Sequence, residues 1–195
     1  MGNEQSGIAV VSRWALNDRT EYALQGDGDQ AGGAALRVRA AAPRGPISFC
    51  CATSYFYLPH HGNKRERQMP GLAKFAREAV GRNDFPPILA GDFNAQNEST
   101  EIRYLKGLQS IDGSSAYFVD AWEFAGEGDG ATWSHTNDFA RGSLLPSRRI
   151  DYVFVGHPRM SDGAGLVEHC AVVCNERVDD VWPSDHFGVF AELRA

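Results

Sequence analysis

The chain has 195 residues, of which 43% are hydrophobic and 23% charged, and it carries a formal net charge of −6. This length suits one domain with a substantial core, so we expect residues 1–195 to form a single domain, and the composition excludes a largely disordered chain. The acidic balance excludes a protein that coats nucleic acid through a basic surface. It does not exclude an enzyme that handles phosphate through metal ions, because carboxylates that hold a metal add negative charge.

The first half of the chain predicts three strands and one helix. The strands are expected at residues 7–14, 34–42 and 46–57. The last two are joined by a hairpin turn at Pro43–Pro46, where two prolines and a glycine supply turn geometry. Lys64–Gly81 is expected to be helical because Leu72 and Val80, among others, recur at helical spacing. Pro70 lies inside this segment, so the helix is either kinked there or regular only from that point.

The second half predicts more strands than helices. Ser99 is a candidate N-cap for a short amphipathic helix over residues 99–108. One helical turn is expected over residues 120–125, and strands are expected at residues 87–93, 149–156, 166–175 and 187–193. Strands are numerous and a regular alternation of strand and helix is not maintained. The pattern therefore favours an α+β fold of packed sheets covered by helices over a doubly wound parallel sheet.

The cysteines indicate a reducing compartment rather than a zinc site. They are Cys50, Cys51, Cys170 and Cys174, and neither pair has the spacing of a zinc motif. Buried thiols in a reducing environment are the simpler interpretation. No stretch of transmembrane length and no secretory leader is visible, so we expect no membrane span and a cytoplasmic protein.

Three short stretches place acidic or imidazole groups beside apolar strands. In the first, GDFN, Asp92 and Asn94 are two residues apart, so in an extended chain their side chains leave on the same face and could position a water or a phosphate oxygen. An ordinary type I turn is the alternative, because Asp and Asn are common turn residues. In the second, RIDY, Asp151 lies within a strand of packing residues and requires a partner, for which an imidazolium is suited. In the third, SDHF, Asp185 and His186 immediately precede an apolar strand.

Together, in this order and spacing, GDFN, RIDYVFV and SDHFGV resemble the endonuclease/exonuclease/phosphatase superfamily of DNase I-like proteins. Two further stretches are similar to this family: GIAVVSRW at Gly7–Trp14 and KRERQ at Lys64–Gln68. The resemblance covers essentially the whole chain. It implies a four-layered α/β sandwich, in which two mainly antiparallel sheets are flanked by helices.

The resemblance also implies a reaction in which a divalent cation, Mg²⁺ or Mn²⁺, polarises a phosphoester that water attacks. On the matching positions, Asp92 would orient or deprotonate the water, and Asn94 would bind a phosphate oxygen. His186 would contact the phosphate as a charged donor held by Asp151, and Asp185 would help to hold the metal. Mg²⁺ prefers hard oxygen ligands and retains several waters, so a few carboxylates suffice.

The substrate-binding residues implied by the resemblance are Ser54, Tyr55, Asn137 and Arg149. Ser54 stands where many members have a histidine that touches phosphate, and Tyr55 is a replacement for it. Asn137 follows Trp133 as a substrate-side polar group, and Arg149 or its neighbour Arg148 would meet phosphate.

The family's first strand carries an Asn, and a later strand ends on a Glu that binds the metal. Neither has a match before Gly7, so we expect a domain that lacks its N-terminal strands and requires a segment to supply them. The expected function is a metal-dependent phosphoester hydrolase of phosphodiesterase or nuclease type, acting on nucleic acid, a lipid headgroup or a small molecule. The alternatives are a non-catalytic remnant of the family and a small-molecule or lipid phosphatase.

Overall fold

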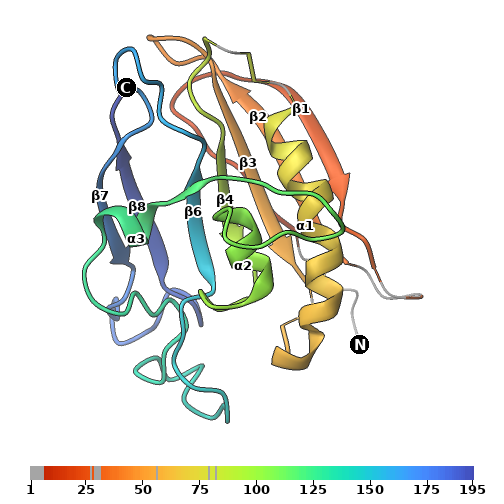
Figure 1. The fold of residues 1–195 in the computed structure, drawn as a ribbon. Coiled ribbons are helices and arrows are strands. Elements are labelled where there is room, and N and C mark those ends of the chain that lie inside the picture. The colour runs from red at the N-terminus through yellow and green to blue at the C-terminus, as the bar shows by residue number, and fades with distance from the viewer. Residues whose placement is uncertain (1–6, 27, 29–31, 56, 79, 82) are drawn as a thin grey trace.

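The structure is a computed structural model that describes residues 7–26, 28, 32–55, 57–78, 80–81 and 83–195. Its strands form a six-stranded sheet in the order β1-β2-β3-β4-β6-β5 and a two-stranded sheet, β7-β8 (Figure 1). All neighbouring strands are antiparallel except β3 and β4, which are parallel. The larger sheet contains β1 (Leu16–Ala23), β2 (Gly33–Ala40), β3 (Ile47–Ser54), β4 (Ile88–Asp92), β5 (Val119–Asp120) and β6 (Asp151–Val155), and the smaller contains β7 (Val167–Val173) and β8 (Gly188–Leu193). The predicted α+β sandwich with two mainly antiparallel sheets is confirmed.

The helices are short apart from α1. They are the 3-10 helix η1 (Pro59–His61), α1 (Gly62–Arg77), α2 (Thr100–Leu105) and α3 (Ala121–Ala125). Helices α1 and α2 lie over the same face of the larger sheet (Figure 1). Within the described ranges, no helix has the length and apolar character needed to cross a bilayer.

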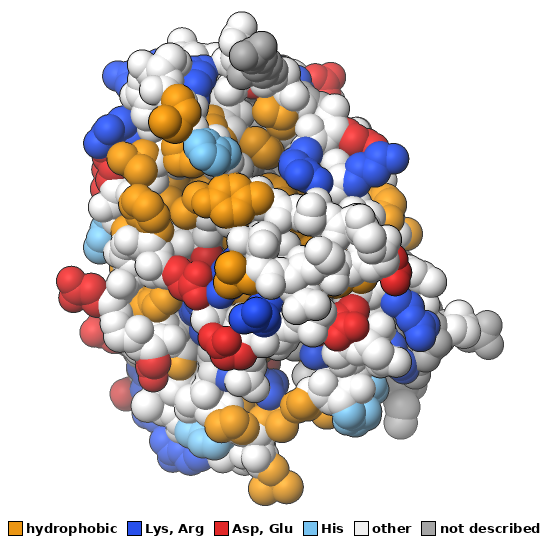
Figure 2. All heavy atoms as spheres, viewed as in Figure 1, with side chains coloured by type: hydrophobic (Ala, Val, Ile, Leu, Met, Phe, Trp, Pro, Cys, Tyr) orange, Lys and Arg blue, Asp and Glu red, His pale blue; other side chains and the backbone are white. Residues whose placement is uncertain are grey.

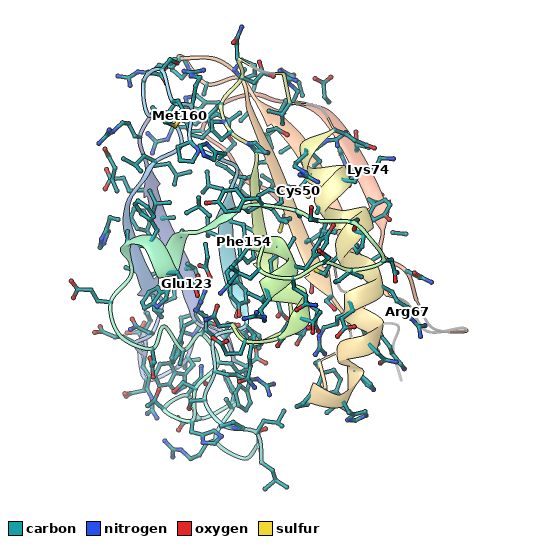
Figure 3. All side chains as sticks on the ribbon, in the orientation of Figure 1. Cys50, Arg67, Lys74, Glu123, Phe154 and Met160 are labelled. Atoms are coloured by element: carbon teal, nitrogen blue, oxygen red, sulfur yellow. The ribbon has the colours of Figure 1, made fainter. Side chains whose placement is uncertain are left out.

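The main core lies between the larger sheet and helices α1 and α2. Leu72 of α1 and Leu105 of α2 belong to the same buried cluster as Leu89 of β4. Cys50 of β3 and Phe154 of β6 join this cluster from the sheet, and Figure 3 shows both on its helix-covered side. Burial of this apolar area is the main stabilising contribution to the fold.

A second buried cluster packs β6 of the larger sheet against β7, β8 and α3. Val155 of β6 is fully buried against Val167 and Cys170 of β7, and Ala121 of α3 completes the buried cluster. Alternate residues of β8 pack against it, namely Val189, Ala191 and Leu193. Strands β6 and β8 thereby lie in contact, which matters for the site described below.

The structure differs from the sequence-based prediction at the N-terminus. Gly7–Trp14 was expected to be a strand, but these residues form no strand and instead line a cavity of about 330 Å³ against the face of β2 and β3 that α1 leaves open. Backbone hydrogen bonds of a sheet form only between neighbouring strands at their edges, so a segment that packs on the face of a sheet cannot join it as a strand. The edge strand is instead β1, whose sequence LNDRTEYA is polar and almost entirely exposed.

The remaining predicted elements are confirmed, with shifts at their ends. Helix α1 begins at Gly62 and continues through Pro70, so it is not restricted to the part after the proline. Ser99 occupies the N-cap position of α2 but makes no side-chain capping hydrogen bond. Asp120 does cap α3, because its side chain accepts a hydrogen bond from the backbone N–H of Trp122 at 3.0 Å. The two-residue strand β5 was not predicted.

The cysteines are free thiols in the structure. Cys50 and Cys170 are buried, as predicted, and Cys51 is half-buried. Cys174 is exposed, so the prediction of buried thiols is wrong for this residue. It lies just after β7 with φ of 54°, in a turn that follows the last residues of the strand.

Candidate active site at the ends of β4 and β6

The end of β4 approaches β3 so closely that glycine is required there. Gly91 has φ of +141°, and a Cβ atom built on it would lie 1.9 Å from the carbonyl oxygen of Ala52 in the parallel neighbour β3. Any other residue would collide with this backbone. The glycine of GDFN therefore lets β4 run alongside β3 up to Asp92, the last residue of the strand.

Asp92 is held by Asn94. The backbone N–H of Asn94 donates to Oδ1 of Asp92 at 2.7 Å, and its side-chain amide donates to Oδ2 at 3.0 Å. Asn94 has φ of 51°, a left-handed conformation that Asn adopts more readily than most residues. The same amide also donates to the carbonyl oxygen of Ser54. Asn94 thus positions the Asp92 carboxylate, while its predicted contact with a phosphate oxygen stays a prediction.

Asp151 lies directly opposite Asp92 in the antiparallel pair of β4 and β6. Its Oδ2 atom is 2.9 Å from Nδ1 of His186, the residue that precedes Phe187 and β8. The two side chains are 19% and 25% exposed, so the pair is shielded but still reachable from solvent. The structure therefore brings Asp92, Asp151 and His186 together from three parts of the chain, as the sequence predicts.

The charges of this cluster shift two pKa values in a direction that suits catalysis. Burial and the neighbouring charge of Asp151 raise the pKa of Asp92 to about 6, against the hydrogen bonds from Asn94 and the charge of His186. Burial alone would lower the pKa of His186, but the hydrogen bond and charge of Asp151, with the charges of Asp92 and Asp185, raise it to about 9. Between these values Asp92 is a carboxylate and His186 is an imidazolium.

Thr132 connects the start of β6, which carries Asp151, to Phe187, which follows His186, and the sequence-based prediction missed it. Its side chain is fully buried, and its hydroxyl accepts hydrogen bonds from the backbone N–H groups of Ile150 and Asp151 at 3.1 and 3.2 Å. Its carbonyl oxygen accepts from the N–H of Phe187 at 2.6 Å. The only sequence signal was its position directly before Trp133.

The loop between α3 and β6, which projects below the sheets in Figure 1, also holds the segment before His186. Asn137 is fully buried; its amide donates to the carbonyl oxygen of Ser184 at 2.7 Å, and its Oδ1 accepts from the N–H of Phe139 at 3.0 Å. The Ser184 hydroxyl in turn accepts from the N–H of His186 at 3.2 Å. These contacts give Asn137 a role in positioning His186, and its predicted contact with substrate stays a prediction.

The cluster has a donor set that fits a hard divalent cation. Carboxylate oxygens of Asp92 and Asp151 lie within 4.8 Å of each other and of a ring nitrogen of His186, and the two carboxylates supply the hard donors. Two carboxylates paired across a sheet repel each other, and a cation between them would relieve that repulsion. Asp185 is exposed and lies outside this group, where it accepts a hydrogen bond from the Ser184 hydroxyl at 3.2 Å.

Two predicted substrate-binding residues have buried side chains that bind other parts of the protein. The hydroxyl of Ser54 is buried and donates to Oε1 of Gln68 of α1 at 3.2 Å, because Ser54 lies on the helix-covered face of β3. Arg149 is also buried, and its guanidinium donates to Oδ2 of Asp120 at 2.7 Å and to Oδ1 of Asn97 at 3.1 Å. Tyr55 is 59% exposed just after β3, where contact with a substrate is sterically open.

The fold and this cluster together define a DNase I-like sandwich with an acidic site at the strand ends. The sequence pattern of the Endonuclease/Exonuclease/phosphatase family matches residues 1–186, so the chain belongs to this family. No curated protein matches the chain significantly.

Solved structures support the same fold. The chain resembles truncated TDP2 from Caenorhabditis elegans with a TM-score of 0.70 and 20% identity, covering 95% of this chain and 69% of that one. It resembles D. rerio TDP2 complexed with a single-strand DNA product with a TM-score of 0.71 and 19% identity, covering 92% and 68%. A family protein from Bacteroides vulgatus gives 0.64 and 20%, covering 93% and 66%. Against another structure of C. elegans TDP2, the chain spans 53% of that protein's length.

Proposed function

We propose that this chain is a metal-dependent phosphoester hydrolase of phosphodiesterase or nuclease type. The observation that carries the proposal is the juxtaposition of Asp92 with the hydrogen-bonded pair of Asp151 and His186. A carboxylate beside an imidazolium supplies a base for water and a charged donor for phosphate within one site. Family membership gives this reading its context, since members of this family act on phosphoester bonds.

In the proposed mechanism each side chain has a separate task. Asp92, fixed by both hydrogen bonds from Asn94, orients the attacking water and takes its proton. His186, kept charged by Asp151, donates a hydrogen bond to a phosphate oxygen through Nε2, because Nδ1 faces the carboxylate. Charge that develops on the phosphate is thereby met by a preorganised cation.

A divalent cation would be held by carboxylate oxygens of Asp92 and Asp151, while Asp185, the ligand expected from the sequence, lies outside this group. Mg²⁺ or Mn²⁺ bound there supplies Lewis-acid polarisation of the phosphoryl oxygen and favours the ionised form of Asp92. The half-buried carboxylate pair supports this assignment, because burial and the charge of Asp151 disfavour the ionised form of Asp92, and a cation would offset both effects.

The choice among substrates rests on two observations. The D. rerio relative was crystallised with a single-strand DNA product, which makes a nucleic acid strand the first candidate. Acidic and basic side chains are interspersed over the face shown in Figure 2, so that face offers no continuous basic track for a long polyanion. A single-stranded nucleic acid is therefore the first substrate to test, and lipid headgroups and small phosphoesters are the alternatives to compare.

The test is hydrolysis of bis-p-nitrophenyl phosphate and of a short single-stranded oligonucleotide, with Mg²⁺ or Mn²⁺ and with chelator. We expect metal-dependent turnover that Asp92→Ala and His186→Ala each reduce at least about a hundredfold, while exposed Asp112→Ala leaves it unchanged. Turnover that persists in both site variants would refute the proposal. A well-folded wild-type chain with no turnover on any phosphoester would instead identify a non-catalytic member of the family.

A further inference from the structure

Arg148 is fixed at the edge of the site by its pairing with Trp133. The backbone N–H of Arg148 donates to the carbonyl oxygen of Trp133 at 2.8 Å, and the N–H of Trp133 donates back at 3.0 Å. The guanidinium carbon lies 4.8 Å from the centroid of the Trp133 ring, within cation–π range. Trp133 directly follows Thr132, so Arg148 is anchored to the same segment that connects Asp151 and Phe187.

The guanidinium of Arg148 has an unused donor. Its Nε atom is buried, and within the described ranges it has no hydrogen-bond partner. Nor does Arg148 take part in an ion pair between described residues, whereas Arg149 beside it is paired with Asp120 at 2.7 Å. A partly desolvated cation without a carboxylate is costly to the fold, so its retention requires another explanation.

One charge that acts on Arg148 comes from the site and one from α1. Burial lowers the pKa of Arg148, Asp92 opposes this effect, and Arg65 adds to it. The guanidinium therefore lies within electrostatic range of the catalytic carboxylate. Arg148 also lines a cavity of about 390 Å³ together with Gln96, Asn97 and Trp122. The backbone carbonyl of Arg148 accepts from the N–H of Thr132, whose hydroxyl accepts from the N–H of Asp151, so this cavity lies beside the segment that supports the cluster.

We infer that Arg148 is a phosphate-contacting residue of this site, whose guanidinium donates to a non-bridging oxygen of the substrate's phosphate. The inference rests on the proposed function and adds a second cation to it, beside His186. An arginine suits this task because it stays charged and presents several donors in one plane. Trp133 packs against the guanidinium at cation–π distance and holds it in place.

The alternative is that Arg148 acts only through the charge of Asp92. In that case its removal would raise the pKa of Asp92 and shift the pH dependence of turnover, while the affinity for phosphate would not change. The two explanations are separated by measuring anion binding directly, without turnover.

The experiment titrates the full chain with inorganic phosphate and monitors the arginine Nε–Hε signals by NMR. The signal of Arg148 is identified by its loss in Arg148→Lys. We expect phosphate to shift this signal, and Arg148→Gln to weaken phosphate binding about ten- to a hundredfold, the effect of losing hydrogen bonds to a charged group. Arg148→Lys should weaken it less, because the charge is kept while the paired donors are lost.

The matched control is Arg141→Gln, which removes the same charge from the same loop. The Arg141 side chain is 65% exposed and is paired with Asp138 at 2.7 Å, so we expect its phosphate affinity to stay within about twofold of wild type. Thermal unfolding of each variant checks that it is folded. If Arg148→Gln does not fold, Arg148→Lys decides, and it must weaken phosphate binding more than Arg141→Gln does.

Equal phosphate affinity in the wild type and the Arg148 variants, or no phosphate binding to the wild type, would overturn the inference. A chain that binds phosphate through Arg148 but hydrolyses nothing would contradict the proposed function alone. A chain that hydrolyses phosphodiesters normally after Arg148→Gln would contradict only the role of Arg148.

Discussion

Asp92 of β4 and Asp151 of β6 occupy directly paired positions in the antiparallel ladder, so two carboxylates face each other across the sheet. Like charges in this arrangement destabilise a sheet. Each carboxylate has its own partner, Asn94 for the first and His186 for the second, yet burial and then the charge of Asp151 still raise the pKa of Asp92. Such an unfavourable pair is typical of a site kept for function rather than for stability.

The first prediction concerns the stability of Asp92→Asn. The pKa of Asp92 is about 6 in the folded chain and 3.8 for an ordinary aspartate, so this group lowers the free energy of unfolding as the pH rises from about 4 to 6, and the loss persists above that. Removing the charge should therefore raise the free energy of unfolding by about 1–2 kcal/mol at pH 8 and leave it nearly unchanged at pH 3.5. Urea unfolding at both pH values measures this.

The control for this comparison is Asp112→Asn, at an exposed turn position with φ of 48°. It should change the free energy of unfolding little at either pH. A fall in stability of Asp92→Asn at pH 8 would contradict the expected repulsion.

The second prediction concerns the ionisation of His186. Its pKa is raised to about 9 by Asp151, and burial opposes the charged form. In Asp151→Asn the pKa of His186 should fall below its ordinary value of 6.5, because burial then dominates. NMR titration of the imidazole signals measures the change. The wild type should also lose about 1–3 kcal/mol of stability as the pH rises from 6.5 through 9, and the variant should not.

The third prediction is the pH dependence of turnover. If Asp92 acts as a base and His186 as a charged donor, kcat/KM should rise as the pH passes about 6 and fall as it passes about 9. Raising the Mg²⁺ concentration should move the acidic limb to lower pH, because a cation favours the carboxylate form. Rates that are flat from pH 5 to 10 would remove both assignments.

The fourth prediction tests the close approach at Gly91. Gly91→Ala places a Cβ atom 1.9 Å from the Ala52 carbonyl oxygen at φ of +141°, so it should destabilise the fold by about 3 kcal/mol or more, or prevent folding. Gly142→Ala is the control, since nothing lies within 4 Å of its added Cβ atom. Thermal unfolding of the two variants side by side distinguishes a specific collision from a general intolerance of alanine.

The fifth prediction tests whether Thr132 holds the start of β6. Thr132→Val keeps the shape but leaves the N–H groups of Ile150 and Asp151 without their acceptor, which should cost about 1–3 kcal/mol. The pKa of His186 should fall as well, because Asp151 is less firmly held. Thr136→Val, at an exposed position in the same loop, should do neither. Unchanged stability of Thr132→Val would show that water replaces the hydroxyl.

The sequence predicted the reactive side chains of the candidate site better than the residues that hold them in position. Asp92, Asp151 and His186 were identified because they end or begin apolar strands in an order that resembles a known family. Thr132 was missed because a buried threonine inside an irregular loop has no pattern of its own, and its importance comes only from the two chain segments that meet at it.

Where the prediction departs from the structure, the cause is side-chain direction or strand pairing. Ser54 was placed at the phosphate from its position after Thr53, but β3 alternates its side chains, and Ser54 faces α1. Gly7–Trp14 has the apolar character of a strand, yet backbone pairing, which composition does not encode, selected the polar segment Leu16–Ala23. Helix α1, a 16-residue element, was predictable because its apolar periodicity is encoded locally in the sequence.

The contacts that assemble the site have a consequence for folding. Asp151 and His186 are 35 positions apart, Asn137 and Ser184 are 47 apart, and Asn94 reaches back 40 positions to Ser54. Contacts of such large sequence separation form late, because long loops must close first. The imidazolium of His186 should therefore appear only in the last step of folding, when the smaller sheet docks. Its NMR signal would then report when the native state is complete.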